Sequence, residues 1–419
     1  MARHTKKELK LMQKLDLPTK ERMSFQRIKA WFESWRKYVI YNEKTKKYRE
    51  VIQVEEPKLN VGEWIEYGCD GQVYVSFSGG KDSAVLGDLC AKVCQMYGWE
   101  LYLVFVNTGL EYPEIQRFVK TYAEWLRKKY DIVVHLDILR PQMRFDEVIK
   151  KYGYPIIGKD QANAVDLARK NIENGNYSYR LRSLGVTVTE AIKMGLKLPS
   201  EELLARYEKT VLDSKYYKPK YKELLDVDFR VSAYCCDVMK KKPAYEYQRK
   251  TGRVPILATM TSESMMREAA WLKRGCNAFE GKTPRSAPMS FWTEQDVLRY
   301  IKKYNIPIAS VYGEIEYAEL PEQMRFEELG YGDFGNEQLT TTGCDRTGCI
   351  FCAFGCQSEK GISRFQRLKE THPRQYKYCI GGGEYNEEGV WQPSKEGLGM
   401  GHVFDELNRR YGDDFIKYK

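Results

Sequence analysis

A short glycine-rich turn between a strand and a helix constrains this chain more than any other feature. Residues 78–83 read Ser-Gly-Gly-Lys-Asp-Ser and directly follow the run Val-Tyr-Val-Ser-Phe at residues 73–77. Valine, tyrosine and phenylalanine favour a β-strand, whereas the apolar run at residues 84–89 is typical of a helix. Backbone N–H groups and the positive end of the helix dipole converge at such a turn. The stretch therefore predicts an anion-binding turn at the end of a strand.

The side chains of this turn suit a phosphorylated ligand. Its two glycines let the backbone approach a phosphate closely, while its serines and lysine add hydroxyl donors and a cation. The carboxylate of Asp82 fits beside phosphates if it holds Mg²⁺ or caps the helix. The glycine spacing of an ordinary P-loop NTPase is absent. The candidate nucleotide-binding residues here are Ser78, Gly79, Gly80, Lys81, Asp82 and Ser83.

Strand and helix patterns alternate over residues 71–139. Strands are expected at residues 73–77, 101–106 and 132–136, with helices at 83–96 and 112–129. This βαβαβ order predicts an α/β fold, a parallel sheet with helices on both faces. Right-handed crossovers place the loops after the strands on one edge of the sheet, where ligands bind.

The hexapeptide in this setting resembles the PP-loop of the ATP-pyrophosphatase superfamily, whose members bind ATP or an adenylyl sulfate and act at the α-phosphate. The resemblance implies an adenine nucleotide alpha hydrolase-like fold, with Lys81 and Asp82 as catalytic residues and Mg²⁺ as a cofactor. A second loop, residues 107–114, resembles the family element in which a Thr-Gly turn precedes Pro-Glu. In relatives this loop lies beside the nucleotide, although a glycine turn before a helix that starts with proline explains it as well. The loop adds the candidates Asn107, Thr108, Gly109 and Glu114.

Two later segments resemble the sulfonucleotide reductases, the phosphoadenosine phosphosulfate (PAPS) reductase family. The first carries the vicinal pair Cys235-Cys236, followed by lysines and a proline. In the second, Glu263, Ser264 and Arg267 match a Glu-Ser-x-x-Arg motif. Arg267 is implied as a catalytic phosphate or sulfate clamp, because a planar guanidinium binds such anions in a bidentate way.

The 11 cysteines are unevenly placed, and in a reducing cytosol this number argues for metal, cluster or catalytic thiols. A dense segment contains Cys344, Cys349, Cys352 and Cys356. One interpretation, implied by cluster-bearing reductases, joins Cys349 and Cys352 to the vicinal pair Cys235-Cys236 in a [4Fe–4S] site. The other closes a local Zn²⁺ site from the dense segment alone, which makes Cys344 and Cys356 alternates.

The chain departs from a sulfonucleotide reductase in two places. Residues 259–261 read Thr-Met-Thr where the reductases carry Gly-x-Arg. The C-terminal Glu-Cys-Gly-Leu-His segment that holds the reductase nucleophile is also missing, and the last cysteine, Cys379, lies in an unrelated Tyr-Cys-Ile-Gly context. Both departures weaken the interpretation as a reductase.

A PP-loop together with a cysteine cluster also resembles ATP-dependent thiolation proteins, including tRNA thiolases and the PP-loop component of DNA phosphorothioation systems. The resemblance implies adenylylation of an acceptor with release of pyrophosphate, then iron–sulfur-assisted sulfur transfer that displaces AMP. Implied partners are an adenine nucleotide, tRNA or DNA, and a cysteine desulfurase as sulfur donor. The formal charge of +10 fits a nucleic acid. The alternatives are a sulfonucleotide reductase and a nucleotide-binding regulatory subunit without turnover.

The 419 residues are expected to form three segments. A basic helical extension covers residues 1–60, a PP-loop domain covers 61–310 with a helical insertion at about 150–230, and the cysteine-rich segment and C-terminal region cover 311–419. Near the end of the second segment, Thr293 is expected to cap a helix that ends near Lys303.

The N-terminal extension is expected to contain a helix at about residues 20–41 with an aromatic stripe, followed by a solvated turn at residues 43–50. Such a helix either packs on the main domain or belongs to an arm that binds nucleic acid or another partner. No apolar stretch approaches the about 18 residues that span a bilayer, and the N-terminus lacks the apolar part of a secretory signal. A cytoplasmic protein without membrane contact is expected.

Overall fold

The computed structural model describes residues 4–211, 217–281, 283–318 and 338–419. Contacts within the chain divide it into two compact units. The first comprises Met1–Asn107, Glu111–Arg140 and Ala244–Thr347, and the second comprises Thr108–Leu110, Pro141–Pro243 and Gly348–Lys419. The insertion expected at about residues 150–230 thus shares a unit with the C-terminal region. The division into an N-terminal extension, a PP-loop domain and a cysteine-rich C-terminal segment, expected from the sequence, stays a prediction.

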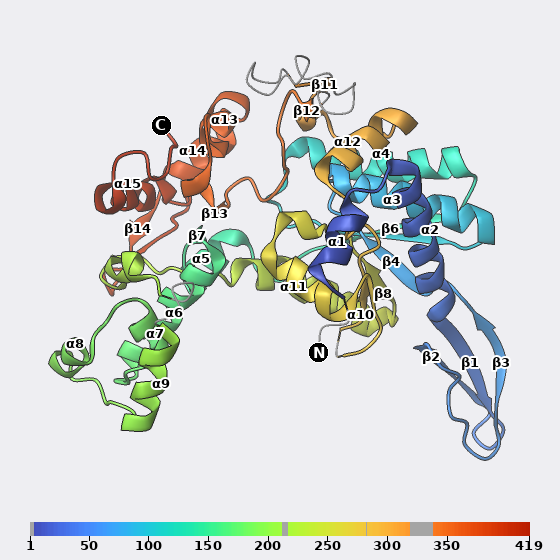
Figure 1. Cartoon of the computed structure of the whole chain (residues 1–419), viewed down its shortest axis with the longest axis horizontal. Coiled ribbons are helices and arrows are strands. Elements are labelled where there is room, and N and C mark those ends of the chain that lie inside the picture. The colour runs from blue at the N-terminus through green and yellow to red at the C-terminus, as the bar shows by residue number, and fades with distance from the viewer. Residues whose placement is uncertain (1–3, 212–216, 282, 319–337) are drawn as a thin grey trace. The chain divides into compact units, whose positions relative to one another are not determined.

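A six-stranded sheet forms the core of the first unit (Figure 1). Its strands are β4 (Val73–Ser76), β5 (Leu101–Val106), β6 (Val134–Leu139), β8 (Val254–Ile256), β9 (Asn277–Ala278) and β10 (Arg285–Ser286). They lie in the order β6-β5-β4-β8-β10-β9, in which β10 and β9 are antiparallel and the other neighbours are parallel. The predicted α/β fold with a largely parallel sheet is confirmed.

Helices flank both faces of this sheet. Side chains alternate along a strand, so Tyr74 and Phe77, at and just beyond β4, face opposite sides. The ring of Tyr74 lies 5.2 Å from that of Tyr247 on α10 (Lys242–Thr251). The ring of Phe77 stacks on Tyr122 of α4 (Pro113–Tyr130) at 4.9 Å.

The first unit contains further elements around the sheet. Its other helices and short helical turns in the described residues are α1 (Lys6–Gln13), α2 (Leu17–Ser34), α3 (Lys81–Tyr97), η3 (Thr261–Glu263), α11 (Met265–Arg274), α12 (Glu294–Tyr304) and η4 (Ser310–Tyr312). A strand pair joins β11 (Ile315–Tyr317) to β12 (Leu339–Thr341). Thr293 caps α12 by accepting a hydrogen bond from the N–H of Asp296, so the predicted cap and helix end are confirmed.

The N-terminal region differs from the helical extension expected at residues 1–60. The helix expected at about residues 20–41 is α2, which ends at Ser34, because Trp35 is extended (φ −99°, ψ 100°). Strands β1 (Arg36–Asn42), β2 (Lys47–Gln53) and β3 (Glu63–Cys69) follow and form an antiparallel sheet in the order β2-β1-β3. The helix prediction beyond residue 34 is wrong, since the run Tyr-Val-Ile-Tyr at residues 38–41 favours a strand once partners are present. Part of the stretch expected as a turn at residues 43–50 supplies one of those partners.

The second unit is mainly helical, as expected for its insertion. Its helices and short helical turns in the described residues are α5 (Phe145–Tyr152), α6 (Lys159–Glu173), α7 (Tyr179–Ser183), α8 (Val188–Lys193), α9 (Glu201–Val211), η1 (Pro219–Leu225), η2 (Asp237–Lys241), η7 (Cys356–Ser358), α13 (Arg364–Thr371), α14 (Pro373–Ile380) and α15 (Met400–Tyr411). Two strand pairs accompany them. They are β7 (Ile156–Ile157) with β13 (Ala353–Phe354), and β14 (Glu384–Tyr385) with β15 (Trp391–Gln392). The β7–β13 pair joins the insertion to the C-terminal region.

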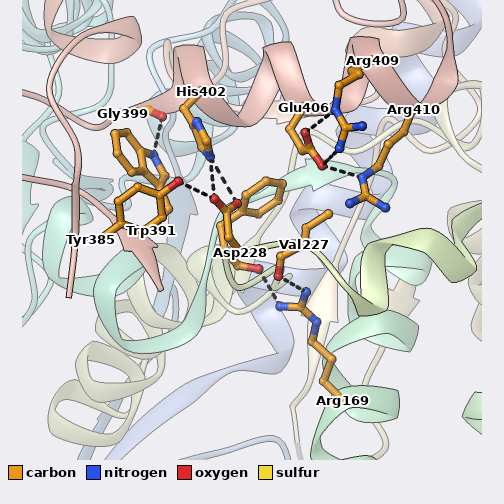
Figure 2. Close-up of polar contacts among 11 residues, drawn as sticks. Arg169, Val227, Asp228, Tyr385, Trp391, Gly399, His402, Glu406, Arg409 and Arg410 are labelled. Atoms are coloured by element: carbon orange, nitrogen blue, oxygen red, sulfur yellow. Dashed lines mark hydrogen bonds and ion pairs between the residues drawn. The ribbon is translucent and has the colours of Figure 1, made fainter. Parts of the chain in front are cut away.

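A polar network holds α15 within this unit (Figure 2). The carboxylate of Asp228 accepts hydrogen bonds from the Tyr385 hydroxyl at 2.7 Å and from Nε2 of His402 at 3.0 Å. Arg169 donates to the carbonyl oxygen of Val227 at 2.7 Å. A cavity of about 550 Å³ lies beside the network and is lined by both charged and apolar side chains. The network thus connects three segments that are far apart in the sequence.

Candidate functional site

The turn at residues 78–83 connects β4 to α3, as expected for a PP-loop. Gly79 adopts φ +74°, and a Cβ atom there would lie 2.6 Å from Cγ2 of Ile115 on α4. Only glycine accommodates both this backbone angle and this close approach. The hydroxyl of Ser83 donates to the carbonyl oxygen of Gly80 at 2.8 Å and lies 3.1 Å from the hydroxyl of Ser78. In this structure the two serines brace the turn.

Lys81 occupies the first turn of α3, and its side chain is buried. Its ammonium group donates to the carbonyl oxygen of Asp345 at 2.7 Å and lies 3.0 Å from Oε1 of Glu294. Burial opposes protonation, but the nearby negative charges, chiefly that of Asp82, outweigh it and raise the pKa of Lys81. Lys81 therefore carries a positive charge beside the turn.

Two hydroxyl groups, from two segments distant in the sequence, lie against the backbone of the turn. The N–H of Lys81 donates to the hydroxyl of Tyr312 at 3.1 Å, and that hydroxyl lies 2.6 Å from Oγ1 of Thr347. Both oxygens lie within contact distance of a Cβ atom built on Gly80, at 3.2 Å and 3.3 Å. The hydroxyl of Tyr312 stands where a phosphate oxygen would accept the same hydrogen bond, so the turn presents a donor to an oxygen acceptor.

A hollow of about 160 Å³ lies beside the turn. Its lining residues are Lys81, Asp82, Met260, Ser262, Glu263, Thr293, Glu294 and Arg346. Oδ1 of Asp82 is buried and has no hydrogen-bond partner among the described residues. Burial raises the pKa of Asp82, against the opposing effect of Lys81. A buried carboxylate oxygen without a donor fits Mg²⁺, which proteins hold through one or two carboxylates together with phosphate oxygens.

The Glu-Ser-x-x-Arg motif borders the same hollow through Glu263. Arg267 forms an ion pair with Glu263, and Nη1 of Arg346 lies 3.6 Å from the same carboxylate. Ser264 caps α11 by accepting a hydrogen bond from the N–H of Met266 at 3.2 Å. Burial and the neighbouring charge of Arg346 lower the pKa of Arg267. Two guanidinium groups thus surround the carboxylate of Glu263. Together with Lys81 they match the three carboxylates at the hollow, which are Asp82, Glu263 and Glu294.

The second predicted loop is divided between the two units. Asn107 follows β5 in the first unit, and Glu114 lies in the first turn of α4 in the same unit. Thr108–Leu110 cluster with the second unit, where the carbonyl oxygen of Leu110 accepts a hydrogen bond from the N–H of Ile350 at 2.7 Å. The Thr-Gly part of this loop is therefore tied to the cysteine-rich segment.

The structure brings some of the predicted residues together and adds others. Lys81, Asp82 and Glu263 line one hollow, and Arg267 is attached to it through Glu263. The residues that sequence reasoning missed are Glu294, Tyr312, Asp345, Arg346 and Thr347. Their only signals were the position of Glu294 directly after a predicted helix cap and the position of the last three among clustered cysteines.

Four of the predicted metal ligands lie in the second unit. Cys235 and Cys236 precede η2, and Cys349 and Cys352 precede β13. The pKa of Cys235 is raised, chiefly by its hydrogen bond with Cys236 and next by burial. The nearby thiols of Cys352 and Cys349 raise it further. The same hydrogen bond lowers the pKa of Cys236, with help from Lys159. These thiols are therefore close enough to influence one another.

Their arrangement does not form a metal centre. Across residues 4–211, 217–281, 283–318 and 338–419, no group of three or more His, Cys, Asp or Glu side chains is placed to hold a metal ion. Cys344 lies in the first unit, where its thiol donates to the carbonyl oxygen of Arg346 at 2.8 Å. Cys356 is buried in the second unit. The cysteines fit a cluster or zinc in their chemistry but not in this geometry, so both metals stay predictions.

A parallel sheet, a glycine-rich turn at the end of its strand β4 and a buried lysine on the next helix define an adenine-nucleotide-binding α/β protein of the PP-loop kind. The family model of the phosphoadenosine phosphosulfate reductase domain matches residues 72–171 and 156–354, which is more than half of the chain. The chain belongs to this family, whose members are enzymes of the PP-loop kind that bind adenine nucleotides.

One relative is an uncharacterized protein of Methanocaldococcus jannaschii, which is 31% identical to this chain over 145 residues. The match covers 33% of this chain and 29% of that protein, so the chain spans less than a third of the relative's length. Within the part of the chain that the structure describes, no helix combines the length and the apolar character needed to cross a membrane.

Proposed function

We propose that this protein activates an acceptor with ATP, releases pyrophosphate, and then replaces the activated oxygen of the acceptor with sulfur. One observation carries the proposal: the buried ammonium of Lys81, the orphaned carboxylate oxygen of Asp82 and the guanidinium of Arg346 line one hollow beside the turn. Positive groups, backbone donors and one carboxylate for Mg²⁺ are what a bound triphosphate requires.

These groups suit chemistry at the α-phosphate. The acceptor oxygen attacks the α-phosphorus, the bond from that phosphorus to the bridging oxygen breaks, and pyrophosphate leaves. Negative charge grows on the leaving group, and the ammonium of Lys81 and the N–H groups at the start of α3 would stabilise it. A ligand oxygen would replace the hydroxyl of Tyr312 at the Lys81 N–H. Mg²⁺ held by Asp82 would supply further neutralisation of the phosphates.

In the second half of the reaction, sulfide attacks the acceptor atom that bears the AMP group. The bond from that atom to the activated oxygen breaks, and AMP leaves with this oxygen. A cysteine desulfurase with a thiol reductant would supply the sulfide, and the acceptor would be tRNA, DNA or a small molecule. Cys235, Cys236, Cys349 and Cys352 supply the four thiols that a [4Fe–4S] cluster requires, and its binding would require these thiols to converge from the positions described above.

Reduction of an adenylyl sulfate is the second candidate, because the matching family model is that of a reductase domain. Such a reaction needs an accessible thiolate that attacks the substrate sulfur. Cys379 is fully buried, its Sγ lies 3.4 Å from Sδ of Met400, and burial raises its pKa well above the usual range. This last cysteine does not suit a nucleophile, which favours sulfur transfer.

The test is turnover of ATP by the anaerobically purified chain with Mg²⁺, sulfide and either tRNA or DNA. Pyrophosphate and AMP are measured, thiolated nucleosides are detected by mass spectrometry, and iron and sulfide are assayed in the same protein. We expect Lys81→Ala to raise the Kd for ATP about tenfold or more, because a hydrogen bond to a charged group contributes about 1.5–3 kcal/mol. Lys120→Ala, which removes an exposed lysine of α4, is the matched control.

The outcomes separate the candidates. Undiminished ATP cleavage by Lys81→Ala would refute the assignment of the turn as the nucleotide site. Release of sulfite from adenylyl sulfate, without AMP formation from ATP, would indicate a reductase. ATP binding without turnover of either nucleotide would indicate a regulatory subunit.

A further inference from the structure

The sheet β2-β1-β3 carries an aromatic face that the proposed function does not use. Tyr41 on β1 lies directly opposite Tyr48 on β2 and Trp64 on β3, so the three rings share one face. The ring centroids of Tyr48 and Trp64 lie 5.0 Å and 4.8 Å from that of Tyr41. Figure 1 shows the three strands as a sheet that follows α2 in the first unit.

A β-bulge adds a fourth ring to this face. The register between β1 and β3 shifts between Val39 and Ile40. As a result Val39, two residues before Tyr41, pairs with Tyr67 rather than with Glu66. Without the extra residue, Tyr67 would point to the opposite face, because side chains alternate along a strand. The bulge therefore places Tyr67 on the aromatic face.

Three of these rings are accessible to a ligand. The exposed fractions of Tyr48, Trp64 and Tyr67 are 62%, 44% and 55%. Large aromatic side chains are usually mostly buried, so three exposed rings on one face of a sheet indicate a binding surface. Planar bases stack on such rings irrespective of sequence, since every base has a π-face.

Positive charge borders the aromatic face. The connection between β1 and β2, with its flanking residue Lys47, contains three lysines and one glutamate, all of them exposed. Of the acidic side chains near the rings, Glu50 pairs with Lys37 at 3.3 Å, and Glu66 accepts a hydrogen bond from the indole of Trp64 at 3.1 Å. This charge complements phosphates and favours a polyanion with exposed bases over an apolar protein surface.

We propose that the aromatic face of Tyr41, Tyr48, Trp64 and Tyr67, together with Lys44, Lys46 and Lys47, binds single-stranded nucleic acid. The bases stack on the rings, and the lysines contact the phosphates. The inference names single-stranded nucleic acid as the acceptor in the proposed function. It rests on that function only for the claim that the bound strand is then modified. RNA and DNA share the recognised chemistry, so both are compared in the test.

The test measures binding of short fluorescein-labelled oligonucleotides to the whole chain by fluorescence anisotropy. RNA and DNA of one mixed sequence are used, each single-stranded and as a duplex. We expect single strands to bind more tightly than duplexes, and Trp64→Ala to raise the Kd about tenfold, as loss of one stacked base does. Tyr48→Phe keeps a ring and is expected to bind like the wild type. Tyr245→Ala removes an exposed ring from α10 and is the matched control.

A second variant keeps the test informative if Trp64→Ala misfolds. Lys44→Ala changes an exposed side chain in the connection, and it should lower the slope of log Kd against log salt concentration by about 0.7. Absence of single-strand binding, or equal effects of Trp64→Ala and Tyr245→Ala in folded protein, would overturn the inference.

ATP measurements separate this inference from the proposed function. Trp64→Ala is expected to bind ATP like the wild type, and Lys81→Ala is expected to bind the oligonucleotides like the wild type. If the face binds single strands and the chain cleaves no ATP, the proposed function fails while the binding surface stands.

Discussion

Substitution of Gly79 by alanine tests the geometry of the phosphate-binding turn. Gly79 adopts φ +74°, where an L-residue costs about 1–2 kcal/mol. The added Cβ atom would lie 2.6 Å from Cγ2 of Ile115 and 3.1 Å from Cγ2 of Val119. Such overpacking costs typically about 1–3 kcal/mol more. We therefore expect Gly79→Ala to lower the free energy of unfolding by about 2–5 kcal/mol in total.

Gly98, the residue that caps the C-terminal end of α3, offers a matched control. It also has a positive φ, +70°, but a Cβ atom there would have no neighbour within 4 Å. Gly98→Ala should therefore cost only the backbone strain of about 1–2 kcal/mol. The difference between the two variants isolates the steric conflict with α4.

The assay is urea unfolding followed by circular dichroism, together with the Kd for ATP. The chain has two compact units, which can unfold in separate transitions. The transition to compare is therefore the one that Gly98→Ala also shifts, since both glycines lie in the first unit. Ile115→Leu removes the Cγ2 methyl group but leaves Cγ2 of Val119 at 3.1 Å, so Gly79→Ala in that background should cost less than in the wild type and still more than the control. Equal costs for the two glycine variants, or no coupling with Ile115→Leu, would refute the packing argument.

Two further predictions concern buried and exposed charges. Asp88 is fully buried between the ammonium groups of two lysines and the hydroxyl groups of two tyrosines. Asp88→Asn should therefore lower the free energy of unfolding by about 3–5 kcal/mol in the same urea assay. The control Glu33→Gln, on the exposed face of α2, should change it by less than about 1 kcal/mol. The pKa of Glu63 is lowered from 4.5 to about 2, chiefly by its hydrogen bond from Arg49. The stabilising effect of the Glu63 carboxylate is therefore present above about pH 4.5 and is lost as the pH falls toward 2. Glu63→Gln should flatten the decline in melting temperature over this pH range. An unchanged decline would contradict the pairing of Glu63 with Arg49.

Local sequence patterns determined the parts of this protein that depend on neighbours in the chain. The strand at residues 73–77, the turn at residues 78–83 and the helix cap at Thr293 were all readable, because propensity, glycine and capping act within a few residues. The repeating strand and helix pattern also predicted the parallel sheet, since its crossovers follow a general rule. Lys81 and Asp82 could be named as candidates for the same reason.

Tertiary structure decided what depends on partners distant in the sequence. Tyr312 and Arg346 reach the turn from segments that are distant in the sequence and whose local patterns do not point to it, because the fold places them there. The end of α2 at Ser34 could likewise not be predicted from the sequence, since the strand that follows it is stabilised by pairing with β2 and β3. A single extra residue in β3 set which face Tyr67 joins, and such a shift in register leaves no mark on the sequence pattern. Sequence thus specified the turn, whereas long-range pairing assembled the surroundings in which it acts.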